Sequence, residues 1–229
     1  DENPDGCKNA NLIDHLVLIS TDPDWTGTSQ DATICQGQQF PLSGVVEGVT
    51  YDAEPSGDFG EGLFIPDEQG NCFSTTLTLT SFAPGSVVED ASTDIESVFV
   101  NMEHSYMGDL TIQLICPNGS VMQLQNQGGG GTFLGEPVDD DFLPDDPGIG
   151  YDYFWSPDAT NGTWTEEAGG FGTLPADTYS AVGMWTSLQG CPLNGTWEIE
   201  ICDILGSDNG FIFEWAINFN PELYPEPIV

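Results

Sequence analysis

Residues 98–119, VFVNMEHSYMGDLTIQLICPNG, carry a β-strand pattern in their second half. Every second position there is apolar: Leu110, Ile112, Leu114 and Cys116. Thr111 and Gln113 lie between them and are polar. Period-two alternation is typical of a strand with one buried and one solvated face. We therefore expect a half-buried strand from residue 110 to residue 116.

The same alternation recurs along the chain. It is strict in TTLTLTSF, residues 75–82. A third strand would bury Trp197, Ile199 and Ile201, and a fourth would line one face with Phe211, Phe213, Trp215, Ile217 and Phe219. Further strands are expected at 95–103, 121–125 and 183–188, and no segment reads as an amphipathic helix. The predicted fold class is all-β, an antiparallel β-sandwich or jelly roll.

Composition excludes several classes of function. The chain has 229 residues, 38 acids and a single base, Lys8, so its formal net charge is −37. Binding to nucleic acid or to an anionic membrane surface needs clustered basic residues, which this chain lacks. Its 38% hydrophobic and 11% aromatic content argues against disorder. So acidic a surface repels itself, which leaves two interpretations open: a salt-adapted solvation surface, or bound divalent cations such as calcium.

Six cysteines indicate an oxidising compartment. They are Cys7, Cys35, Cys72, Cys116, Cys191 and Cys202. No CxxC pair occurs and histidine is scarce, so a zinc site is not expected. An even count favours three disulfides, but six cysteines allow 15 pairings and sequence alone does not choose among them. No signal peptide and no apolar run of about 18 residues is present, so we expect a mature secreted protein or a piece of a larger one.

The chain divides into three parts by composition. Residues 1–70 are expected to form a small immunoglobulin-like module or an N-terminal arm, with strands at 15–20, 34–42 and 49–52. Residues 71–220 form the predicted jelly roll, and PELYPEPIV, residues 221–229, reads as a proline-rich linker. Within the jelly roll, residues 128–174 make a long acidic segment, which is expected to be either a solvated acidic loop or a loop held to the sheet by a cation.

Three blocks of sequence resemble the P domain, the β jelly roll that follows the catalytic domain in proprotein convertases and recurs in secreted bacterial proteins. The first is His104, Tyr106, Gly108–Leu110 and Pro117–Gly119; the second is GTWEIEICD, residues 195–203; the third is SDNGFIFEWAINF, residues 207–219. The resemblance spans about residues 72–220. ICQG at 34–37 with a later Gly-x-Cys at 70–72 resembles immunoglobulin-like repeats of Bacteroidetes-type surface proteins.

Calcium is the cofactor that this resemblance and the acidic loops favour. The candidate ligands are Glu103, Asp109, Asp140, Asp141, Asp203 and Asp208. Calcium takes six to eight oxygens, so backbone carbonyls or water would complete the shell. His104 is expected to be structural, beside Tyr106 and Asp109. Its neighbour Ser105 cannot pair with it as a nucleophile, because adjacent strand residues point to opposite faces.

The sequence thus predicts a non-catalytic, extracellular structural or adhesive module of a large secreted or cell-surface protein. Its expected partners are other modules of the same polypeptide or copies of itself, with assembly into fibres, and surface glycans. One alternative is the accessory P domain of a secreted subtilisin-like protease. Another is a carbohydrate-binding module that stacks sugars on Trp155, Trp164 and Trp185, unless these side chains are buried and hold the long loops in place. Three Asn-Gly-Ser/Thr motifs, at Asn118, Asn161 and Asn194, read as turns rather than glycosylation sites.

Overall fold

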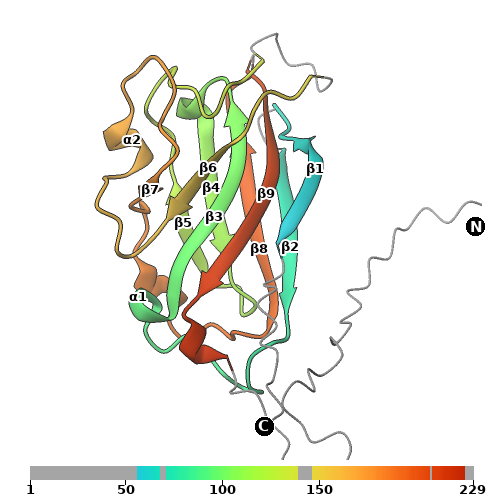
Figure 1. Ribbon diagram of the computed structural model, residues 1–229, viewed down its shortest axis with the longest axis vertical. Coiled ribbons are helices and arrows are strands. Elements are labelled where there is room, and N and C mark those ends of the chain that lie inside the picture. Colours follow the sequence, from blue (N-terminus) through green and yellow to red (C-terminus); the bar gives the residue numbers. More distant parts are fainter. Residues whose placement is uncertain (1–55, 68–70, 139–145, 207, 225–229) are drawn as a thin grey trace, which may run out of the picture. The chain divides into compact units, whose positions relative to one another are not determined.

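The computed structural model describes residues 56–67, 71–138, 146–206 and 208–224. These residues form two β-sheets packed face to face (Figure 1). The five-stranded sheet has the order β1 (Gly57–Phe64), β9 (Gly210–Phe219), β3 (Ile95–His104), β6 (Tyr151–Trp155) and β7 (Thr178–Tyr179). The four-stranded sheet has the order β2 (Cys72–Leu79), β8 (Gly195–Asp203), β4 (Leu110–Ile115) and β5 (Val121–Gln125). The predicted all-β sandwich is confirmed.

The expected strand pattern is largely present. All strand pairs are antiparallel except β6 with β7. Trp197, Ile199 and Ile201 of β8 are fully buried between the sheets. Beside them in the same sheet, β4 buries Leu110, Ile112 and Leu114, as its alternation predicts. These inward side chains form one continuous core with those of β3 and β9.

The apolar face predicted for β9 is wrong at its start. The partner of Asn101 is Glu214, but the partner of Met102 is Ile212, so Phe213 is an extra residue in the ladder. Such a bulge places the side chains before it on the face opposite to the one that the alternation after it would give them. Ile212 consequently enters the core beside Trp215. The ring of Phe213 turns outward, over Gly62 and Gly150.

The strand predicted at 183–188 is also wrong. Residues Trp185–Leu188 form a 3₁₀ turn, η2, closed by a bond from the Ser187 N–H to the Met184 carbonyl (3.0 Å). Side chains three residues apart share a face of a 3₁₀ helix, and here Trp185 and Leu188 both pack on the core. Other short helices are α1 (Ala91–Asp94), η1 (Met107–Asp109), α2 (Trp164–Glu167) and η3 (Pro221–Leu223).

Two disulfides are present among the described residues. Cys72–Cys202 joins β2 to β8, and Cys116–Cys191 ties the end of β4 to the segment before β8. They close 130 and 75 residues respectively, and chain-entropy arguments assign loops of this size about 4–5 kcal/mol each. Cys7 and Cys35 lie outside the described residues.

The sandwich includes residues on both sides of the expected boundaries. β1 precedes residue 71 and pairs with β9 along the edge of the five-stranded sheet. At the other end, η3 follows residue 220, and Tyr224 stacks on Phe82 with ring centroids 4.6 Å apart. The remainder of the expected arm or immunoglobulin-like module, with its strands at 15–20, 34–42 and 49–52, lies outside the described residues, as do residues 225–229 of the expected linker.

Three connections between the sheets meet at one end of the sandwich. Their described parts are residues 65–67 and 71 between β1 and β2, 105–109 between β3 and β4, and 204–206, 208 and 209 between β8 and β9. The strand register brings them together, because His104 pairs with Gly210 and Leu110 pairs with Asp203. This end lies opposite α1 (Figure 1). We call it the crossover end.

Candidate functional site

A buried histidine lies at the crossover end. His104 is 0% exposed, and its Nε2 lies 3.0 Å from Oδ2 of Asp203, whose side chain is equally buried. The other ring nitrogen, Nδ1, accepts the backbone N–H of Tyr106 at 3.0 Å. Because Nδ1 accepts, the single ring proton of a neutral imidazole lies on Nε2 and is donated to Asp203. His104 therefore holds β3 of one sheet to β8 of the other.

Gly210 makes room for this ring. A Cβ at Gly210 would collide with Cδ2 of His104 and lie 2.8 Å from the carbonyl oxygen of Glu103. The Asp-Asn-Gly at 208–210 resembles a turn signal in sequence, but its glycine is needed for the close approach of β9 to the histidine. This role follows from the strand register, which places Gly210 directly opposite His104.

Ser105 is held by the neighbouring connection. Its N–H donates to the carbonyl of Asn209 (2.9 Å), and its Oγ accepts the N–H of Asn209 (3.1 Å). The Ser105 side chain is therefore engaged with the β8–β9 connection rather than with the imidazole of His104. The pair offers no nucleophile activated by a base.

Carboxylates gather around the same histidine. Burial first, and then the negative charges of Asp203, Asp208 and Asp67, raise the pKa of Asp109 to about 6, against the opposing effect of His104. These four aspartates come from all three connections of the crossover end, and we call them the aspartate cluster. Three of its members, Asp109, Asp203 and Asp208, are ligands predicted from sequence.

The aspartate cluster is made of carboxylates, the side chains that hard cations prefer as ligands. Oδ1 of Asp203 is buried, with no hydrogen-bond partner among the described residues, and a buried carboxylate oxygen without a donor is costly. Calcium prefers carboxylate and carbonyl oxygens, and its charge would offset both the burial and the repulsion that raise the pKa of Asp109. Asp67 is not among the ligands predicted from sequence, because the sequence analysis assigns residues 1–70 to a separate module. Recognising β1 as part of the sandwich would have placed Asp67 here.

Glu103 lies away from the aspartate cluster. Its neighbours Met102 and His104 both point inward, and Met102 is in the core. Because successive side chains of a strand point to opposite faces, the Glu103 side chain projects from the outer face of β3. Its Oε1 accepts the N–H of Gly148 at 3.3 Å, and its Oε2 is buried without a hydrogen-bond partner among the described residues. Burial raises the pKa of Glu103 to about 7. Asp140 and Asp141 lie outside the described residues.

A different trio has metal-like spacing but unsuitable chemistry. The ligand atoms of Cys72, Glu200 and Cys202 lie within 4.8 Å of one another. The two sulfurs, however, form a disulfide. A metal-binding cysteine must be a thiolate, so this trio is not a metal site.

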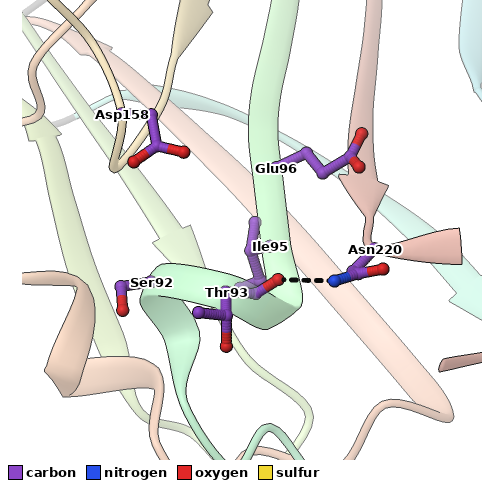
Figure 2. A pocket seen from close by; sticks show the side chains of 6 residues that line it. All are labelled: Ser92, Thr93, Ile95, Glu96, Asp158 and Asn220. Carbon is purple, nitrogen blue, oxygen red and sulfur yellow. Dashed lines mark hydrogen bonds between the residues drawn. The ribbon is translucent and has the colours of Figure 1, made fainter. Parts of the chain in front are cut away.

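A polar pocket of about 570 Å³ lies at the α1 end of the sandwich (Figure 2). It is lined by Ser92, Thr93, Ile95, Glu96, Asp158 and Asn220. Asn220 donates its amide to the Thr93 carbonyl (3.1 Å), and the Ser92 hydroxyl donates to Asp90 (2.6 Å). No imidazole, amine or thiol lines this pocket, so its hydroxyls have no base stronger than a carboxylate.

The tryptophans expected to stack sugars are mostly inaccessible. Trp155 and Trp164 are both 0% exposed and stack on each other with centroids 4.5 Å apart. Trp185 is half-buried and packs against the core. The prediction of sugar-stacking surfaces at Trp155 and Trp164 is therefore wrong, because these indoles complete the hydrophobic core.

The three Asn-Gly motifs have structural partners. The amide nitrogen of Asn118 donates to the Gly190 carbonyl (3.3 Å), that of Asn161 to Thr178 (2.9 Å) and that of Asn194 to Phe82 (2.9 Å). A glycan on any of these nitrogens would replace a hydrogen bond that joins two segments of the fold.

Comparison with known proteins shows that part of the chain is similar to a known family. Residues 95–171 match the family model of the proprotein convertase P-domain, which confirms the resemblance seen in the sequence. The chain is 25% identical over 122 residues to the transglutaminase-activating metalloprotease of Streptomyces mobaraensis, covering 53% of this chain and 10% of that protein. It is 24% identical over 155 residues to leupeptin-inactivating enzyme 1 of Streptomyces exfoliatus, covering 68% of this chain and 24% of that protein. The chain thus spans a quarter or less of these two relatives.

Among solved structures, the serine protease of Aeromonas sobria matches with a TM-score of 0.37 and 14% identity, covering 72% of this chain and 26% of the protease chain. The same protease in complex with the chaperone ORF2 gives a TM-score of 0.38. Within the part of the chain that the structure describes, no helix has the length and apolar character needed to cross a membrane.

Proposed function

We propose that this chain is a non-catalytic P-domain module that accompanies a protease domain in a longer, secreted polypeptide. The observation that carries the proposal is the P-domain match over residues 95–171. One curated relative is named a metalloprotease, and this chain corresponds to 10% of it, which leaves most of that protein for other domains. These comparisons favour the accessory role over the structural or adhesive module that the sequence alone suggests first.

The geometry of His104 supports a role outside catalysis. Both ring nitrogens are engaged in buried hydrogen bonds, to Asp203 and to the Tyr106 N–H. A general base must reach the proton that it abstracts from substrate, and this imidazole is 0% exposed. The residues that carry the P-domain pattern therefore act as a structural connection between the sheets.

A structural calcium ion at the aspartate cluster is part of the same proposal. Asp67, Asp109, Asp203 and Asp208 would supply carboxylate ligands, and backbone carbonyls or water would complete the shell. When bound, the ion supplies positive charge and cross-links the three connections of the crossover end. The support is the buried Oδ1 of Asp203, together with the burial and the mutual repulsion that raise the pKa of Asp109.

The accessory role is tested in the complete encoded polypeptide. We would compare secreted peptidase activity with and without residues 56–226, and assay the 229-residue chain alone against a broad peptide library. We expect deletion to lower the yield of folded, active protease and the isolated chain to hydrolyse nothing. Hydrolysis by the isolated chain would overturn the non-catalytic assignment. A polypeptide without a peptidase domain would instead restore the structural or adhesive function.

The calcium site is tested by calorimetric titration of the 229-residue chain after chelation. We expect calcium binding that is lost in Asp109→Asn and Asp203→Asn and kept in Glu198→Gln, which changes a β8 carboxylate facing away from the core. Undiminished binding in both aspartate variants would place calcium elsewhere. If calcium does not bind the unaltered chain, the aspartate cluster is a group of mutually repelling carboxylates and not a calcium site.

A further inference from the structure

The sandwich has four edge strands, and three of them are protected from pairing with another chain. An exposed edge presents a row of unpaired N–H and C=O groups, which proteins commonly blunt with short strands, charges, bulges or a covering segment. β1 carries two acids, Asp58 and Glu61, and an irregular register between Asp58 and Leu63. β7 has only two residues. β5 is covered by the next segment, through bonds from Val182 to Leu124 (3.2 Å) and from Gly183 to Gln123 (2.7 Å).

Among the described residues, β2 has none of these protections. It is eight residues long and contains no proline and no charge. Its ladder with β8 is continuous from Cys72 opposite Cys202 to Leu79 opposite Gly195. Residues 71–88 contain no charged side chain, in a chain that has 38 acids. This edge is therefore long, regular and uncharged.

The register shows which backbone groups point outward from β2. Cys72 and Cys202 have Cα atoms 4.2 Å apart, the short spacing of a pair that does not exchange hydrogen bonds. Alternation gives Ser74, Thr76 and Thr78 the same relation to β8, so their N–H and C=O groups point away from it. All three residues are exposed, and no backbone partner occurs for them among the described residues.

We propose that β2 pairs antiparallel with β2 of a second copy of this chain, across a twofold axis at Thr76. Thr76 would then face Thr76 of the second copy, and Ser74 would face Thr78 of the second copy. The two four-stranded sheets would become one sheet of eight strands. Each of the three facing pairs exchanges two N–H···O bonds, and a twofold axis makes the contact self-complementary and closed.

The side chains suit this register on both faces. Small hydroxyl side chains meet on the solvent face, and cross-strand Thr–Thr and Thr–Ser pairs are favourable. On the inner face, Thr75 would lie opposite Leu77 of the second copy, and Phe73 opposite Leu79 of the second copy. Phe73 is only partly buried in the single chain, so the second copy would cover more of it.

Charge also favours this edge for self-association. The nearest acids on the solvent face, Glu198 and Glu200, lie on β8. In the joined sheet they are separated from those of the second copy by three strand spacings, about 14 Å. This exceeds the screening length of about 8 Å at physiological salt. The overall charge of −37 still opposes dimerisation, so added salt should strengthen it. Pairing with a basic strand of another protein would instead weaken with salt.

The test is sedimentation velocity of the 229-residue chain over a range of concentrations in 0.1 and 1 M NaCl. We expect a dimer whose population rises with concentration and with salt. Thr76→Glu places two like charges opposite each other and should raise the dissociation constant about tenfold or more. Thr196→Glu adds the same charge to the same sheet face but on interior strand β8, and should leave the dimer intact. Equal melting temperatures of the two variants would show that both are folded.

A cysteine variant tests the register. Thr76→Cys should be joined to a second copy by a short bis-maleimide, because the two side chains face each other, and Thr196→Cys should not. A monomer at every concentration and salt would overturn the proposal. So would an undiminished Thr76→Glu dimer, association that weakens as salt rises, or equal cross-linking through Thr196→Cys.

Discussion

Nε2 of His104 lies 3.0 Å from Oδ2 of Asp203, and this buried hydrogen bond joins the last residue of β3 to the last residue of β8. The two strands belong to different sheets. The bond therefore crosses the sandwich at the end where three connections and four aspartates meet. Stability, ion binding and pH dependence of the domain should all depend on this end.

Removing the imidazole should destabilise the domain strongly. His104→Ala leaves the carboxylate of Asp203 buried without its donor, and breaking a buried charge-assisted pair costs about 3–5 kcal/mol. Asp203→Asn should cost less, because the amide oxygen still accepts from Nε2. Urea denaturation in the presence of chelator measures both. Equal losses of unfolding free energy in the two variants would show that the hydrogen bond between His104 and Asp203 does not account for the stability that the imidazole contributes.

A methyl group at Gly210 should destabilise the domain by about 1–3 kcal/mol, the usual cost of overpacking. Its Cβ would meet the His104 ring and the Glu103 carbonyl, and neither can move without disturbing β3. Gly169→Ala is the matched control, since its Cβ would make only an ordinary contact, 3.4 Å from the Phe171 carbonyl. Thermal unfolding of the two variants should separate them clearly.

Without calcium, the stability of the domain should fall as pH rises from about 4.5 to 7. The pKa of Glu103 is raised to about 7 and that of Asp109 to about 6, both by burial first. The folded state therefore binds protons more tightly than the unfolded state, and this stabilisation is lost as pH rises through the folded pKa values. Glu103→Gln should flatten the decline, while Glu198→Gln should not. Melting temperature in chelator from pH 4 to 8 is the measurement.

Calcium should reverse this trend above pH 6. Bound calcium needs the ionised carboxylates, so its stabilisation grows as the aspartates lose their protons. At a hundredfold excess of calcium over its dissociation constant, linkage gives about 2.7 kcal/mol. We expect Asp109→Asn to lose this calcium-dependent increase in melting temperature. If the increase were the same in Asp109→Asn as in the unaltered chain, it would have to arise elsewhere.

The strands that define the sandwich could be predicted because their signal is local. Each alternation, as in Leu110 to Leu114, reports a half-buried surface within a few residues. The strand predictions fail where contact with a neighbouring element determines the local backbone. Phe213 is displaced by a bulge against β3, and Trp185 turns into a 3₁₀ helix to pack with Leu188.

The candidate site could be predicted only in part. Asp109, Asp203 and Asp208 lie beside sequence blocks that resemble the P domain, and the structure brings them together. Glu103 is one position from His104, and the pleat sends it to the opposite face. Asp67 follows β1, a glycine-rich strand with weak alternation, so nothing in its neighbourhood points to an ion.

The sequence alone thus determined the all-β class, the half-buried strands and the P-domain resemblance, because these depend on periodicity and ordered motifs within single segments. The tertiary structure decided which residues meet: Gly210 beneath His104, Asp67 beside Asp109, and an uncharged β2 at an open edge. Those relationships depend on strand order and register between residues that lie far apart in the sequence. Sequence periodicity carries no information about that pairing, since it reports burial and not the identity of the neighbour.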